Sequence, residues 1–113
     1  MTNVEMHKAI CEELNRIYEK KNHDYGDSFH QTFLEEGMAM PRIRLSDKLS
    51  RFKALTKAGV QEVNDESIRD TLLDLANYAL MTVMELAEYQ ELYADGKLVE
   101  TIRVNPHALP RKD

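Results

Sequence analysis

The sequence has few of the residues that usually cross-link or rigidify a small fold. Its 113 residues include one cysteine, no tryptophan, three prolines and four glycines. Because Cys11 has no partner within the chain, no intrachain disulfide can form, and small secreted domains usually depend on such bonds. No apolar run is long enough to cross a bilayer, and residues 1–5 lack the basic and apolar segments of an export signal. We therefore expect a cytoplasmic protein without a membrane partner.

Basic residues are outnumbered by acidic residues. The chain has 15 Lys and Arg residues against 20 Asp and Glu residues, which gives a net charge of −5. Affinity for duplex nucleic acid comes largely from Lys and Arg on phosphates, so this balance argues against a duplex-binding protein. A free nucleotide held through a metal ion remains open. The apolar content of 42% and charged content of 31% are typical of one folded globular domain at this length.

The first third of the chain is predicted to be a helix followed by a structured loop. Thr2 and Glu5 have capping-box spacing, and apolar residues follow at helical intervals, which predicts a helix from about residue 3 to residue 21. Residues 22–27 are dense in turn formers and predict a loop. A short helix is expected to follow, which Gly37 ends.

Two longer helices are predicted after this loop. Pro41 suits the first turn of a helix that ends at Gly59. A third helix opens at Asn64 or Asp65, and no breaker follows before Asp95, so it would span about 30 residues. Residues 1–96 are thus predicted to form one all-α domain, a helical bundle around one long helix, and residues 97–113 an extended C-terminal tail.

The long helix carries more apolar surface than its shorter neighbours can cover. On a helical wheel its apolar residues form one wide arc, made of Ile68, Leu72, Leu75, Ala76, Ala79, Leu80, Val83, Leu86 and Ala87. Helical domains with surplus apolar surface tend to bury it against another subunit. We therefore expect a homo-oligomer, either a dimer or a dimer of dimers.

An acidic row lies on another side of the same helix. Glu66, Asp70 and Asp74 recur at intervals of one helical turn, and Asn77 follows them. Like charges at this spacing repel, unless a hard cation such as Mg²⁺ lies against them. The alternative is that acids in the first turn stabilise the helix dipole and that the others face water or pair with bases. If Asp74 binds a metal, Asp74→Asn should leave stability unchanged or raise it, whereas a salt bridge predicts a loss.

Two further motifs suggest contact with an anionic ligand. Arg44, Lys48 and Arg51 form a basic line on the second long helix and would either bind phosphate or pair with the acidic row. Residues 21–26 combine a cation, an amide, a carboxylate and an aromatic ring, which suits a ligand-binding loop or an ordinary turn. The four histidines have no zinc-site spacing and are expected at the surface.

Together, residues 21–26, 43–51 and 65–78 resemble the nucleotide-modification-associated domain of phages and prophages, over about residues 18–86. That domain is in turn similar to the all-α nucleoside triphosphate pyrophosphohydrolases, the MazG-like and dimeric dUTPase group. The resemblance implies hydrolysis of a (deoxy)nucleoside triphosphate to the monophosphate and pyrophosphate, with Mg²⁺ or Mn²⁺ as cofactor.

The resemblance also implies roles for single residues. Its metal ligands would be Glu66, Asp70 and Asp74, and its catalytic carboxylates Asp47, Asp70 and Asp74. Its substrate-binding residues would be Lys21, Asp24, Tyr25, Lys48, Arg51, Asn77 and Tyr78. MazG-like enzymes carry a Glu-x-x-Glu pair on an earlier helix, where this chain has only Asp47. A non-catalytic nucleotide-binding or interaction module therefore remains the alternative, and a purely structural helical assembly protein is a third hypothesis.

Overall fold

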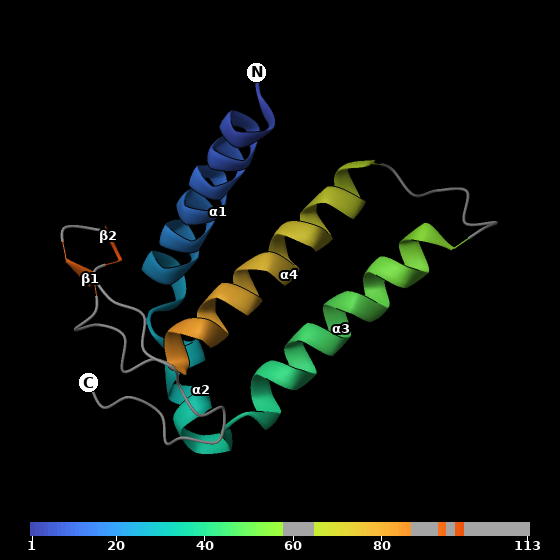
Figure 1. Ribbon diagram of the computed structural model, residues 1–113. Helices are drawn as coiled ribbons and strands as arrows, with labels where there is room; N and C mark the ends of the chain where they lie inside the picture. The colour runs from blue at the N-terminus through green and yellow to red at the C-terminus, as the bar shows by residue number, and fades with distance from the viewer. Residues whose placement is uncertain (58–64, 87–92, 95–96, 99–113) are drawn as a thin grey trace.

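The computed structural model describes residues 1–57, 65–86, 93–94 and 97–98. Its elements are α1 (Asn3–Tyr25), α2 (Ser28–Glu36), α3 (Ala39–Thr56), α4 (Asp65–Glu85) and an antiparallel pairing of β1 (Tyr93–Ala94) with β2 (Lys97–Leu98). The predicted all-α class is confirmed: α4 lies between α1 and α3, and α2 lies at the lower end of the bundle in Figure 1. None of the described helices is both long and apolar enough to span a membrane.

Helix α1 begins at the predicted capping box and ends later than predicted. The Thr2 hydroxyl accepts a hydrogen bond from the Glu5 N–H at 3.1 Å, and the Glu5 carboxylate accepts one from the Thr2 N–H at 2.8 Å. The loop predicted to start at residue 22 is wrong, because residues 22–25 continue the helix. The Gly26 N–H donates to the Asn22 carbonyl at 2.8 Å, and Gly26, with φ 65°, ends α1. Turn-forming side chains weaken a helix only slightly, whereas a glycine at positive φ stops it.

A glycine also separates α2 from α3. Gly37 has φ 64°, and its N–H donates to the Phe33 carbonyl at 2.8 Å, so α2 ends where the sequence predicts. Pro41 lies in the first turn of α3, as predicted, and is fully buried. Helix α3 ends at Thr56, earlier than the predicted stop at Gly59, because the next residue already has extended backbone.

Helix α4 begins at Asp65, as predicted, but it is shorter than predicted. It has 21 residues, and the hydrogen bond from the Leu86 N–H to the Thr82 carbonyl, 3.0 Å, closes its last described turn. The prediction of a continuous helix up to Asp95 is therefore wrong.

The two short strands lie on either side of Asp95 and Gly96 in the sequence. Tyr93 pairs with Leu98 and Ala94 with Lys97. An Asp-Gly pair is a favoured connection between two antiparallel strands, and this local signal competes with helix continuation. The extended conformation predicted after residue 96 holds for Lys97–Leu98, and residues 99–113 lie outside the described residues. The predicted boundary between the domain and its tail falls inside this strand pairing.

The helices pack around a small apolar core, and hydrogen bonds link α1 to α4. Among the described residues, the buried apolar side chains are Leu14, Phe33, Met40 and Leu73, together with Pro41. The Asn77 amide, also buried, donates to the Leu14 carbonyl at 3.1 Å. The Arg69 guanidinium donates to both oxygens of the Glu13 carboxylate, one of them at 2.8 Å. This hydrogen bond is the main reason why the pKa of Glu13 is lowered and that of Arg69 is raised.

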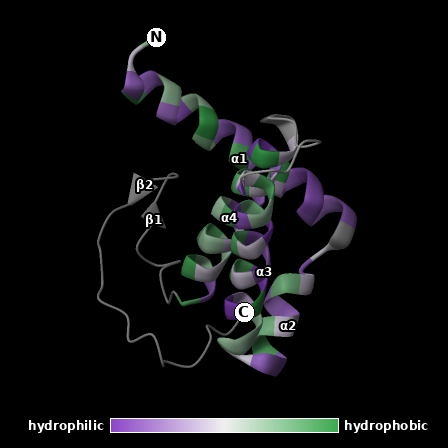
Figure 2. Cartoon of the chain, turned by 90° about the vertical axis from the view of Figure 1, so that its right-hand side faces the viewer, coloured by the Kyte–Doolittle hydropathy of each residue, from purple (hydrophilic) through white to green (hydrophobic). Residues whose placement is uncertain are grey.

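The apolar side of α4 is only partly covered. Leu72, Leu80 and Val83 belong to the predicted apolar arc, yet each is about half exposed. The N-terminal half of α1 projects away from the other helices and leaves Val4 exposed (Figure 2). None of the described elements covers these side chains, so we expect a second copy of the chain to pack against this side of α4.

The first prediction concerns this assembly. Leu80→Glu should convert a dimer or larger oligomer into a monomer of 13.1 kDa, because it places a charge in the expected interface. Ile43→Glu on α3 is the matched control, since Ile43 is 59% exposed and Leu80 51%. Light scattering would measure both masses, and a parent protein that is already monomeric at micromolar concentration would contradict the prediction.

The second prediction concerns pH. The pKa of Glu13 is lowered in the folded state, so its contact with Arg69 stabilises the fold above the ordinary pKa of a glutamate, about 4.3, and is lost as pH falls through the lowered value. Glu13→Gln should therefore lower the melting temperature slightly at neutral pH and progressively less in acid. A difference that grows toward acid pH would contradict this sign, and Glu12→Gln is the control on the neighbouring exposed position.

Candidate functional site

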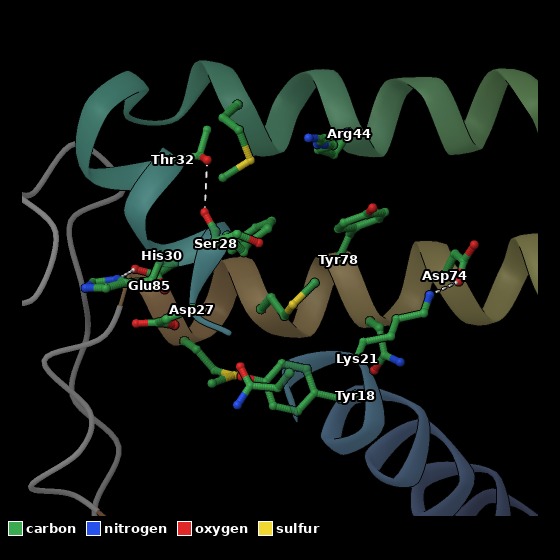
Figure 3. A pocket seen from close by; sticks show the side chains of 16 residues that line it. Tyr18, Lys21, Asp27, Ser28, His30, Thr32, Arg44, Asp74, Tyr78 and Glu85 are labelled. Atoms are coloured by element: carbon green, nitrogen blue, oxygen red, sulfur yellow. Dashed lines mark hydrogen bonds and ion pairs between the residues drawn. The ribbon is translucent and has the colours of Figure 1, made fainter. Parts of the chain in front are cut away.

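A cavity of about 290 Å³ lies between the four helices. Figure 3 shows the side chains that surround it. Its lining residues are Tyr18, Lys21 and Asn22 of α1, Asp27 before α2, Ser28, Phe29, His30 and Thr32 of α2, Met40 and Arg44 of α3, and Asp74, Asn77, Tyr78, Met81, Met84 and Glu85 of α4. Each helix therefore contributes side chains, and the cavity exists only in the folded bundle.

Aromatic rings and thioethers form the apolar part of the lining. Phe29 of α2 and Tyr78 of α4 are stacked, with ring centroids 6.1 Å apart and an angle of 27° between the planes. Tyr18 adds a third ring from α1, and Met81 and Met84 line the same cavity. Flat rings and polarisable sulfurs provide good contact surface for a planar aromatic ligand.

Two lysines and one carboxylate form a charged triad, Lys21–Asp74–Lys48, at one end of the cavity. The Lys21 ammonium lies 3.2 Å from Asp74 Oδ1, and the Lys48 ammonium lies 3.1 Å from Asp74 Oδ2. The triad joins α1, α4 and α3, and its net charge is positive. The basic line of α3 therefore does lie against α4, as the sequence predicted under both interpretations.

The rest of the basic line lies on either side of the triad along α3. Arg44 lines the cavity near Tyr78 (Figure 3). Arg51 donates through Nε to the Thr71 hydroxyl at 3.3 Å and does not line the cavity. Arg44 is therefore better placed than Arg51 to meet a ligand, although the resemblance assigned that role to Arg51.

A buried hydrogen bond between His30 and Glu85 lies at the opposite end of the cavity. His30 Nδ1 donates to Glu85 Oε2 at 2.7 Å, and the two side chains are only 2% and 4% exposed. The sequence-based expectation that His30 is a surface residue is wrong. A lone histidine gives no local signal of burial, and the partner that makes burial tolerable is 55 residues away.

The structure brings several of the predicted site residues together. Lys21, Asp74, Asn77 and Tyr78 all line the cavity, and Lys48 contacts Asp74 beside it. The Asn77 amide is engaged with the α1 backbone, which gives this residue a structural role as well.

The other predicted site residues lie elsewhere. Asp47 and Asp70 are exposed and outside the cavity lining. Asp24 is exposed and forms an ion pair with His23 at 3.5 Å, also outside the lining. The side chains of Tyr25 and Glu66 lie outside the described part of the structure.

Sequence reasoning did not identify the rings and methionines of the lining. Tyr18, Phe29, Met81 and Met84 have the helical spacing of ordinary core residues, so nothing distinguishes them before the helices are packed. These side chains come from α1, α2 and α4, so they surround one cavity only because of how these helices pack. No local sequence pattern predicts that packing.

The fit to Mg²⁺ can be judged from the donor groups. No three His, Cys, Asp or Glu side chains converge among the described residues. Asp70 and Asp74 are one turn apart on α4, and Mg²⁺ commonly takes one or two carboxylates together with substrate phosphates. Both oxygens of Asp74 contact lysines here. The residues therefore suit Mg²⁺ only when a phosphate-bearing ligand supplies the remaining oxygens.

Comparison with known proteins gave one family match. The family model described as nucleotide modification associated domain 1 matches residues 21–86. These residues contain Lys21, Lys48 and Asp74 and run through α4. No curated protein and no solved structure matches the chain.

Proposed function

Because the chain belongs to the family of nucleotide modification associated domain 1, we propose that its cavity binds a nucleoside triphosphate and that the domain hydrolyses it. The products would be the nucleoside monophosphate and pyrophosphate. One observation carries the binding step: an aromatic cavity built by four helices opens beside a pair of lysines.

The apolar part of the cavity suits the base. A base would stack on the rings of Phe29 and Tyr78 and contact the thioethers of Met81 and Met84. A cavity of about 290 Å³ is small for a ligand pocket, so it suits the base and sugar better than an entire triphosphate. Figure 3 places Asp74 and Lys21 at the opposite end of the cavity from Glu85, which leaves the phosphates near the lysines.

The cations of the opening suit the phosphates. Lys21 of α1 and Lys48 of α3 contact Asp74, and Arg44 of α3 lines the cavity. Ammonium and guanidinium groups bind phosphate oxygens through short, charge-assisted hydrogen bonds. During hydrolysis the same groups would balance the negative charge that accumulates on the leaving pyrophosphate.

The acidic row of α4 is the part of the proposal that concerns catalysis. Asp70 and Asp74, preceded by Glu66, would hold Mg²⁺, which neutralises phosphate oxygens and lowers the pKa of an attacking water. The rings would hold the nucleoside in place while the lysines fix the phosphates, and such positioning is a large part of catalysis of phosphoryl transfer. Asp47 has no described contact with this region, so its catalytic role stays a prediction of the resemblance.

A non-catalytic nucleotide-binding or interaction module is the second candidate. It is favoured by the ion pairs of Asp74, whose charge is already balanced by lysines without any metal. In that case the cavity and the lysines would keep their binding role, while no reaction would follow.

The activity test is hydrolysis of separate ribo- and deoxyribonucleoside triphosphates by the purified protein with Mg²⁺. We expect monophosphate and pyrophosphate in equal amounts, and we expect Asp70→Asn to reduce turnover more than nucleotide affinity. Tight binding without any product would reject the hydrolase proposal and favour the binding module.

The binding test uses Tyr78→Ala. This change should weaken nucleotide affinity by about fivefold to 150-fold, because stacking on one aromatic ring contributes about 1–3 kcal/mol per base. Phe52→Ala is the control, since Phe52 is a half-buried ring of α3 outside the cavity lining. Calorimetric titration would measure both affinities, and an equal loss in the two variants would argue against a base in this cavity.

A further inference from the structure

The triad Lys21–Asp74–Lys48 has the form of a site that already holds an anion. Each lysine contacts a different oxygen of the same carboxylate, at 3.2 Å and 3.1 Å. The carboxylate therefore separates two ammonium groups that would otherwise repel each other. Figure 3 shows the Lys21 side chain reaching from α1 across to Asp74 on α4.

Solvent has access to all three groups. The Lys21 side chain is 58% exposed, Asp74 is 29% exposed and Lys48 is 28% exposed. Partly exposed ion pairs are worth little and break easily, so an incoming anion can replace Asp74 without unfolding the bundle. A phosphate group offers the same kind of charged oxygen and more of them.

We propose that Asp74 occupies the phosphate site of the ligand-free protein, and that the di- or triphosphate of a nucleotide displaces it from Lys21 and Lys48. This inference rests on the proposed function, because it assumes that the ligand of the cavity carries phosphates. Asp74 is then a competing internal anion before binding, and its carboxylate is released when the phosphates take both lysines.

Displacement sets an order of binding. While the lysines hold both oxygens of Asp74, the carboxylate is a poor ligand for a divalent cation. Once phosphate has taken the lysines, Asp74 is free one turn from Asp70. The nucleotide is therefore expected to bind first and the metal afterwards.

The ion pairs also reverse an expectation from the sequence. Repulsion along the acidic row predicts that Asp74→Asn leaves stability unchanged or raises it. In the structure, Asp74 neutralises two lysines, so its removal leaves them facing each other. Asp74→Asn should lower the melting temperature of the ligand-free protein.

The decisive experiment measures the affinity for inorganic pyrophosphate in the presence of EDTA. We expect Asp74→Asn to bind pyrophosphate about tenfold more tightly than the parent protein, a gain of about 1.4 kcal/mol. Pyrophosphate should also raise the melting temperature of the variant more than that of the parent. Glu19→Gln is the control, since it removes the same charge from an exposed position of α1 outside the cavity.

A second variant, Lys48→Gln, keeps the inference testable if Asp74→Asn does not fold. Lys48→Gln leaves Asp74 with one lysine, so the ligand-free protein should bind Mn²⁺ more tightly than the parent, as measured by electron paramagnetic resonance. Where Asp74→Asn does fold, adding Lys48→Gln should remove its gain in pyrophosphate affinity, which would tie the gain to the lysines.

Failure of this inference can be told apart from failure of the proposed function. If the parent binds a nucleoside triphosphate but Asp74→Asn binds pyrophosphate no more tightly than Glu19→Gln, then Asp74 does not occupy the site and the inference is wrong. If the parent binds no nucleotide, with or without Mg²⁺, the proposed function is wrong. A tenfold gain for Asp74→Asn would then still support displacement by a phosphate anion.

Discussion

The cations beside the cavity are arranged around one carboxylate that contacts lysines of two other helices. Asp74 is on α4, and its two oxygens contact lysines of α1 and α3. Without this shared anion, the cations of α1 and α3 would repel each other across the central helix. The same contact therefore places two cations beside the cavity and lowers the repulsion between them.

The helices themselves could largely be predicted from the sequence, because their signals are local. The capping box at Thr2 and the stop at Gly37 act through neighbouring backbone groups. The errors at residues 22–25 and beyond Glu85 arose where two local signals competed. At residues 22–25 the helix continues through turn-forming side chains. After Glu85 the helix ends, and the chain forms a strand pairing further on.

The site could be predicted only in part, because its contacts join distant segments. The spacing of charged residues on α4 and α3 identified Asp74 and Lys48 as candidate site residues, since both lie in regular charged rows. Spacing could not show that Lys21, 53 residues from Asp74, completes the triad. The burial of His30 and the stacking of Phe29 on Tyr78 likewise depend on where α2 packs. Periodicity describes one helix at a time, whereas the cavity is a property of all four.

An internal anion would also keep small anions from occupying the site. The protein has a net charge of −5, so polyphosphates are not attracted to it in general, and at physiological salt the lysines act only over about 8 Å. Free phosphate would have to displace Asp74 and has no ring for the cavity, so its net affinity would be low. A nucleotide would offset the same displacement with stacking on Phe29 and Tyr78. The displacement cost is the same for both anions, so the preference for a nucleotide would come from stacking, while Asp74 would lower the affinity of small anions below the level at which they occupy the site.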